Sequence, residues 1–278
     1  MSSIRPPDLP DYERPPLVEV VLSIQFAPLS GFGNLNSALL WELFRAKFPK
    51  YQEQPPLPPA FEVFGLNPTA TPQIQVSMGV PTVRFWFDKE DGSEVIQIQN
   101  NRFVHNWRKS KEDQEYIHYE KIRRHFREEV KKLEDYLCEH DFEELHPNQC
   151  EVIYINHISL PDSSNPYNNL HRVLSFLAQP NFGRKTPHLE DSTLQLRFIL
   201  RDKEENIGRL HVHAVPALHI AGQKPLIQLA LTARGRPHAE TVESAFDFMD
   251  LGRDAIVRTF DSITTSEMHS YWGRKNGQ

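Results

Sequence analysis

The chain has 278 residues, 39% of them hydrophobic and 24% charged, with a formal net charge of −6. This composition is typical of a folded globular protein with one large domain or two modest ones, and the negative charge argues against a surface built throughout to neutralise phosphates. The first sixteen residues lack the apolar run of a secretion signal, and no later stretch is long enough to span a bilayer. We therefore expect a cytoplasmic protein that does not contact a membrane.

Two prolines separate an N-terminal arm, residues 1–16, from the first predicted strand. Pro15 and Pro16 lack backbone N–H donors and fix φ, so neither fits inside a helix or a sheet ladder. From Leu17 to Phe26 apolar and polar residues alternate, with Val21 as the exception. This pattern predicts a half-buried strand.

The first half of the chain, residues 17–140, continues with a predicted amphipathic helix over residues 34–48. A proline-rich loop follows at residues 54–59, and then come three short strands at residues 72–78, 82–88 and 94–99. A turn at residues 89–92 joins the last two strands. Residues 119–137 have the clearest helical periodicity of the chain. The apolar stripe of the first helix comprises Leu35, Leu39, Leu40, Leu43, Phe44 and Phe48.

The same order of elements recurs in residues 150–265. Glu19 and Glu151 occupy corresponding positions in the first strand of each half, although the identity between the halves is low and a coincidence of element order is the alternative. The sequence predicts an α+β fold of two similar β-α-β(3)-α halves, with antiparallel sheets covered by helices. This topology is similar to that of TATA-binding-protein-like folds. The elements of the second half are a strand at 150–161, a helix at 170–178, strands at 194–202, 209–219 and 225–235, and a helix at 241–263.

Four stretches together resemble a sporadically distributed bacterial family without an assigned activity. They are PPLVEVVLSIQF (residues 15–26), IQNNRFVHNWRK (98–109), YIHYEKI (116–122) and AIVRTFDSITTSEMHSYWGR (255–274). The N-terminal PPLVEVV signature and the RFxxNWRK motif are the most specific parts. The resemblance implies a bacterial origin and genes carried on mobile or phage-defence islands.

Arg102, Asn106, Trp107 and Arg108 are the candidate ligand-binding residues. A β-bulge near residues 100–101 would place Arg102, Asn106 and Arg108 on one face, where two guanidinium groups beside an amide can bind a phosphate or a carboxylate. Residues 102–132 contain ten Lys and Arg against six Asp and Glu, which favours an anionic ligand. In the alternative interpretation Trp107 packs on the long helix while the arginines form ion pairs with Glu120 or Glu128.

His211 and His213 form an H-x-H pair on a predicted strand, with their imidazoles on one face about 7 Å apart. They are the weaker alternative for a metal site, because Pro216 should interrupt the strand before His219 and the segment contains no carboxylate. The chain contains neither a phosphate-binding loop nor the familiar hydrolase motifs, so we expect no cofactor. Cys138 and Cys150 are too few for a disulfide framework, and we expect both to be core residues.

The C-terminal segment, residues 266–278, should form a short helix and a tail. Thr264 and Glu267 have the spacing of a capping box that would start this helix. Its Met268, Tyr271 and Trp272 either fold back onto the core or contact a second subunit or partner.

These observations favour a non-enzymatic binding or adaptor protein that works with a partner protein or as a homo-oligomer, with an anionic ligand as a further expectation. Two alternatives stay open. One is an enzyme, either a metal-dependent hydrolase using His211 and His213 or a nuclease-like enzyme using scattered acidic residues. The other is a protein that binds nucleic acid through its basic strand and helix.

Overall fold

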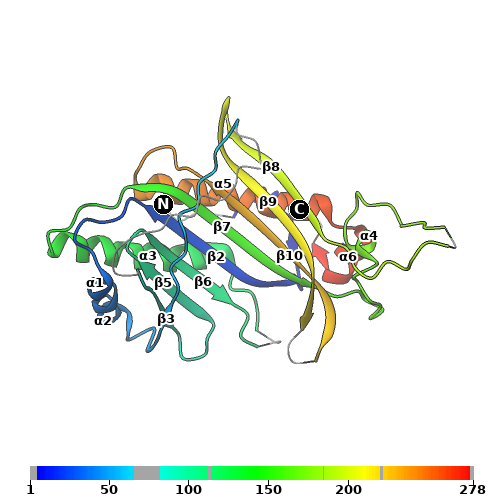
Figure 1. The fold of residues 1–278 in the computed structure, drawn as a ribbon, viewed down its shortest axis with the longest axis horizontal. Coiled ribbons are helices and arrows are strands. Elements are labelled where there is room, and N and C mark those ends of the chain that lie inside the picture. Colours follow the sequence, from blue (N-terminus) through cyan, green and yellow to red (C-terminus); the bar gives the residue numbers. More distant parts are fainter. Residues whose placement is uncertain (1–4, 66–81, 112–113, 184, 220–221, 276–278) are drawn as a thin grey trace.

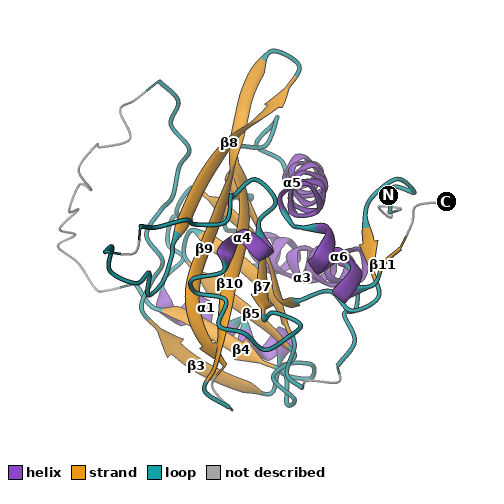
Figure 2. Cartoon of the chain, turned by 90° about the vertical axis from the view of Figure 1, so that its right-hand side faces the viewer, coloured by secondary structure: helices purple, strands orange, loops and turns teal. Residues whose placement is uncertain are grey.

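The computed structural model describes residues 5–65, 82–111, 114–183, 185–219 and 222–275. Nine strands of these residues form one antiparallel sheet in the order β3-β4-β5-β6-β2-β7-β10-β9-β8. The two long helices, α3 (Tyr119–Glu139) and α5 (Val242–Ile263), lie on the same face of this sheet (Figures 1 and 2). The predicted α+β class with a large antiparallel sheet is confirmed. The strands are β2 (Leu17–Phe26), β3 (Lys50–Gln54), β4 (Arg84–Asp88), β5 (Glu94–Gln99), β6 (Arg102–Arg108), β7 (Pro147–Ile158), β8 (Leu194–Asp202), β9 (Glu205–His219) and β10 (Lys224–Gly235).

The hydrophobic core lies between the sheet and the two long helices. Val20, Leu22 and Ile24 of β2 are at most 1% exposed, as the alternation predicts. Ser23 and Gln25 on the opposite face are buried as well, so β2 is buried on both faces and not half-buried as predicted. Ile122 and Phe126 belong to the apolar stripe of α3 and are fully buried. None of the described helices is long and apolar enough to cross a membrane.

The two central strands, β2 and β7, pair with each other and each carries one glutamate opposite an arginine. Glu19 of β2 is the cross-strand partner of Arg108 in β6, and Glu151 of β7 is the partner of Arg234 in β10. Outward from this centre the order is β6, β5, β4, β3 on one side and β10, β9, β8 on the other, so β3 has no counterpart among the described strands.

The prediction of one continuous helix at residues 34–48 is wrong, and only part of its apolar stripe is buried. Two short helices, α1 (Asn34–Leu39) and α2 (Trp41–Phe44), replace it, with a break at Leu40. Leu40, Phe44 and Phe48 are buried, whereas Leu35, Leu39 and Leu43 are exposed. Helices this short bury only the side chains that reach the core, so the stripe is half solvated.

Three further predictions concern single elements. The helix expected at residues 170–178 is only one turn long, α4 (Leu170–Val173). The strand expected at residues 72–78 lies outside the described residues, and β3 was not predicted. The expected bulge near residues 100–101 is a two-residue turn, because Gln99 pairs with Arg102 and the register between β5 and β6 is unbroken. A two-residue turn keeps Ile98 and Phe103 on the same face without any bulge.

The N-terminal arm is anchored to the C-terminal segment. Strand β1 (Asp11–Tyr12) pairs with β11 (Arg274–Lys275), and the Tyr12 ring contacts Phe260 and Trp272 edge-on. Helix α6 (Ser266–Trp272) is capped by Thr265, whose hydroxyl accepts from the Met268 N–H, so the predicted cap is wrong by one residue. Met268 and Trp272 are buried against the core, whereas Tyr271 is 43% exposed.

Candidate functional site

Arg102, Asn106 and Arg108 lie on β6 and point to the face of the sheet opposite the helices, which we call the open face. Trp107 has the other parity and is 1% exposed, with its ring 5.2 Å from that of Tyr116. The structure therefore brings the two arginines and the amide together on one face and places the tryptophan in the core.

The polar side chains of β6 contact carboxylates of the two central strands, β2 and β7. Arg108 Nε donates to Glu19 Oε1 at 3.0 Å, and Asn106 Nδ2 donates to the same oxygen at 2.6 Å. Arg102 is 6% exposed, and its Nη1 lies 3.6 Å from Glu151 Oε2. The arginines thus form ion pairs, but with glutamates of the sheet rather than with Glu120 or Glu128 of α3.

An extended part of the chain, residues 55–65, crosses the open face, and we call it the covering segment (Figure 1). Gln99 binds the backbone of Leu57 twice, donating to its carbonyl at 3.0 Å and accepting from its N–H at 2.9 Å. Arg102 Nη2 donates to the Pro58 carbonyl at 3.1 Å, and Gln25 Oε1 accepts from the Ala60 N–H at 2.9 Å. These hydrogen bonds are made to main-chain groups, so they do not depend on the side chains of the bound segment.

Glu62 is the one acidic residue of the covering segment. Side chains of β9 and β10, in the other half of the sheet, bind it on the open face. Its Oε2 accepts from Arg209 Nη1 at 2.5 Å, and its Oε1 lies 2.6 Å from His211 Nε2 and 3.6 Å from Arg234 Nη1. The Glu62 side chain is only 6% exposed. Strands β9 and β10 therefore form a carboxylate-binding site on the open face.

The charge state of Glu62 follows from these contacts. Burial alone would raise the pKa of this carboxyl, but hydrogen bonds from His211 and Arg209 and the charge of Arg234 outweigh burial, so its pKa lies below the usual value. Glu62 is consequently ionised at neutral pH, and the contact is a charge-assisted one.

His211 and His213 share the open face of β9, and the carboxylate absent from their own segment comes from Glu62. His213, two residues further along the strand, is exposed. Pro216 does not interrupt the strand, which continues to His219 and pairs with β10. Strand β8 begins at Leu194, opposite Ala214, so the part of β9 beyond Ala214 pairs with β10 alone. An edge position of this kind tolerates Pro216, which has no N–H group.

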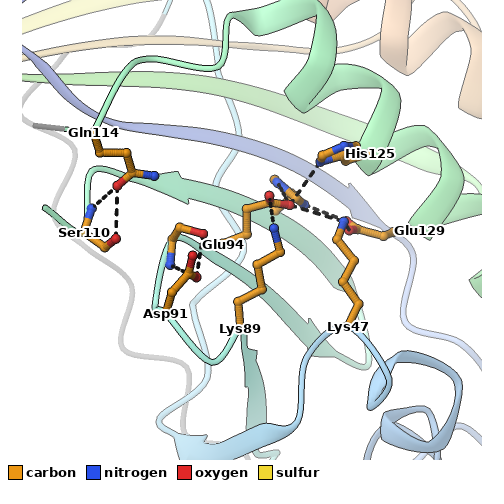
Figure 3. A network of polar contacts seen from close by, with 10 residues as sticks. Lys47, Lys89, Asp91, Glu94, Ser110, Gln114, His125 and Glu129 are labelled. Carbon is orange, nitrogen blue, oxygen red and sulfur yellow. Dashed lines mark hydrogen bonds and ion pairs between the residues drawn. The ribbon is translucent and has the colours of Figure 1, made fainter.

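A second group of polar residues lies on the other face of the sheet, beneath α3 (Figure 3). Glu94 of β5 and Glu129 of α3 are both bound by Lys47, and Glu94 is also bound by Lys89 and His125. Burial alone would raise the pKa of Glu94, but hydrogen bonds from His125 and Lys89 and the charge of Lys47 lower it far below its usual value.

A cavity of about 650 Å³ lies between the N-terminal arm, the ends of β7 and β10, and α5. The Tyr116 and Tyr154 hydroxyls on its wall are 3.2 Å apart, and burial raises the pKa of both. At its mouth Arg5 and Lys275 both pair with Asp11. Its mixture of apolar and balanced charged groups favours no single ligand class.

Sequence reasoning missed Glu62 and the group around Glu94. Glu62 stands in a loop whose contacts come from strands far along the chain, so no local pattern reveals it. The group beneath α3 left a signal, since Glu94 and His105 fall on the buried face of their strands and His125 and Glu129 have i, i+4 spacing on the helix. Polar residues at core positions of adjacent elements indicate a shared polar contact.

Comparisons with protein-family models, with curated proteins and with solved structures each found no match. The resemblance to an uncharacterised bacterial family therefore stays a prediction.

Proposed function

We propose that this chain is a cytoplasmic, non-enzymatic binding protein that works with a partner protein, and that its open face binds an extended acidic segment of that partner. The observation that carries this proposal is the covering segment. Its main chain is bound by side chains of β2, β5 and β6, and its one carboxylate by side chains of β9 and β10.

The contacts divide into two kinds with different consequences. Gln25 and Gln99 bind peptide groups, which every extended segment offers, and so provide affinity without strong sequence preference. Arg209, His211 and Arg234 surround one carboxylate and so select for an acidic residue at that place. An acidic segment two or three residues beyond a proline-rich stretch would fit both.

A partner can replace the covering segment because polar contacts, rather than a buried apolar face, hold it. Phe61 and Val63 are 55% and 51% exposed. The contacts between the segment and the sheet within the described residues are made by side chains, and no sheet ladder includes the segment. A competing segment with the same two features would exchange with it by mass action.

The test uses a fluorescent peptide with the sequence of residues 54–65, QPPLPPAFEVFG, and a matched peptide in which glutamine replaces its glutamate. Glu62→Gln should weaken the hold of the covering segment and raise the affinity of the protein for the acidic peptide by about tenfold, since a charge-assisted hydrogen bond contributes about 1.5–3 kcal/mol. The matched peptide should gain much less. Glu53→Gln, a change at an exposed acid of β3, is the control.

Equal binding of the two peptides, or no binding to either protein, would contradict the proposal. If the Glu62→Gln variant instead binds single-stranded nucleic acid with an affinity that falls steeply with salt, the nucleic-acid alternative replaces it. Arg209→Ala should abolish the gain produced by Glu62→Gln, because it removes the strongest donor to the carboxylate.

We also propose that residues 17–140 and 150–265 are two copies of one unit, with a topology similar to that of TATA-binding-protein-like folds. The strand order on the two sides of the β2–β7 pair and the matching Glu19–Arg108 and Glu151–Arg234 pairs support this. If the halves are equivalent, superposing residues 17–140 on residues 150–265 in an experimental structure should overlay β2 on β7 and α3 on α5. Failure of these first strands and long helices to overlay would speak against equivalence.

A further inference from the structure

The residues beneath α3 place a cation between two carboxylates. The Lys47 ammonium lies 3.2 Å from Glu94 Oε2 and 3.1 Å from Glu129 Oε1. Both carboxylates are buried, with 4% and 5% of their side chains exposed, whereas the Lys47 side chain is 39% exposed. The position between the carboxylates therefore binds positive charge that reaches it from the solvent side.

His105 lies beside the same position with one nitrogen unused. Its Nδ1 is 2.6 Å from Glu129 Oε2, while its Nε2 lies 3.7 Å from Glu94 Oε2 and has no hydrogen-bond partner among the described residues. The side chain is fully buried. A buried nitrogen without a hydrogen-bond partner destabilises the fold, so a ligand at Nε2 would stabilise it.

The contact at Nδ1 has the form that orients histidine ligands in metal sites. A carboxylate that accepts the Nδ1 proton fixes the tautomer and leaves the lone pair on Nε2, which here faces Glu94. Ligand atoms of Glu94, His105 and Glu129 all lie within 4.8 Å of one another. Two carboxylates and one imidazole suit Mn²⁺, Fe²⁺ or Zn²⁺.

We propose that Glu94, His105 through Nε2 and Glu129 through Oε1 bind a divalent transition-metal ion, and that the Lys47 ammonium takes its place when the ion is not bound. The charges support this exchange. Lys47 supplies one positive charge between the two glutamates, and a divalent ion at the same place supplies two. Lys47 can then turn into solvent, because its side chain is already partly exposed.

The exchange predicts that Lys47 competes with the ion. In calorimetric titrations with Mn²⁺ and with Zn²⁺, Lys47→Met should bind one ion per chain at least tenfold more tightly than the wild-type protein. Lys131→Met is the matched control, because it removes an exposed lysine of α3 that pairs with Asp135 and retains every surface histidine. This control should bind the ion as the wild-type protein does.

His105→Gln in the Lys47→Met background should remove the gain while the circular dichroism spectrum stays unchanged. Equal ion binding by Lys47→Met and Lys131→Met would overturn the proposal, and so would a gain that survives His105→Gln. If Lys47→Met does not fold, Lys47→Gln replaces it in the test, because the glutamine amide can still donate a hydrogen bond to the carboxylates but carries no charge. Peptide binding at the open face is a separate readout, so this site and the proposed function can fail independently.

Discussion

Replacing Arg102 by alanine should lower the free energy of unfolding by about 3 kcal/mol. The guanidinium donates to Gln25 Oε1 at 2.6 Å and to the Pro58 carbonyl at 3.1 Å, and its charge faces Glu151. Each hydrogen bond from a charged donor contributes about 1.5–3 kcal/mol. Gln25 keeps the Ala60 N–H as a donor, and Glu151 keeps Arg234, so part of the loss is offset.

Arg108→Ala on the same strand is the comparison. Its side chain is 32% exposed and pairs with the 21% exposed Glu19, and its guanidinium lies 5.0 Å from the Trp86 ring. A partly exposed ion pair and such a ring contact together contribute about 1 kcal/mol. Urea unfolding followed by tryptophan fluorescence measures both variants. Equal losses in the two variants would refute the reasoning that the buried Arg102 contributes more to stability than the partly exposed Arg108.

Three further predictions concern other parts of the chain. Gly235→Ala should destabilise the protein by about 3 kcal/mol in urea unfolding, since a Cβ there would lie 2.3 Å from the Ile207 carbonyl oxygen and 2.6 Å from the Phe248 ring, whereas Gly33→Ala, with open space around it, should change little. The contact of Glu62 should be fully present above its usual pKa of 4.5 and weaken as the pH falls through its lower pKa in the folded protein, so hydrogen exchange of the covering segment, corrected for intrinsic rates, should rise in acid in the wild type but not in Glu62→Gln. Exposed Cys138 should react with a thiol reagent in the native protein, whereas Cys150, which is buried and whose pKa burial raises, should react only after unfolding; equal rates would contradict this.

Periodicity and turn signals predicted most of the strands and both long helices, including β5 and β8 with the bounds that the structure has. β2, α3, β10 and α5 each have a long apolar alternation or stripe, and each lies within a few residues of its predicted bounds. The prediction of a helix at residues 34–48 was wrong because the two short helices there can bury only part of this apolar stripe against the core. The expectation that Cys138 is a core residue was wrong because Cys138 follows buried Tyr136 and Leu137 and lies off the buried stripe of α3.

The candidate site was less predictable because it is assembled from distant segments. The pattern of β6 was enough to group Arg102, Asn106 and Arg108, but their partners Glu19 and Glu151 come from the two central strands. Pairing between β2 and β7 joins residues more than one hundred positions apart, and no local propensity encodes that register. The same holds for Glu62, which meets Arg209 across 147 positions of the chain.

The pairing of β1 with β11 has a mechanical consequence. Asp11 lies opposite Lys275 and Tyr12 opposite Arg274, so the chain leaves both strands at the same end of this two-stranded ribbon. A pulling force applied to the two flanking segments would therefore load its hydrogen bonds one after another, as in a zipper, instead of shearing them together. The ribbon would open at low force. The next resistance would come from the backbone hydrogen bonds that Glu13 and Arg14 donate to the C-terminal segment and from the contacts of the Tyr12 ring with Phe260 and Trp272, before any strand of the large sheet bears tension.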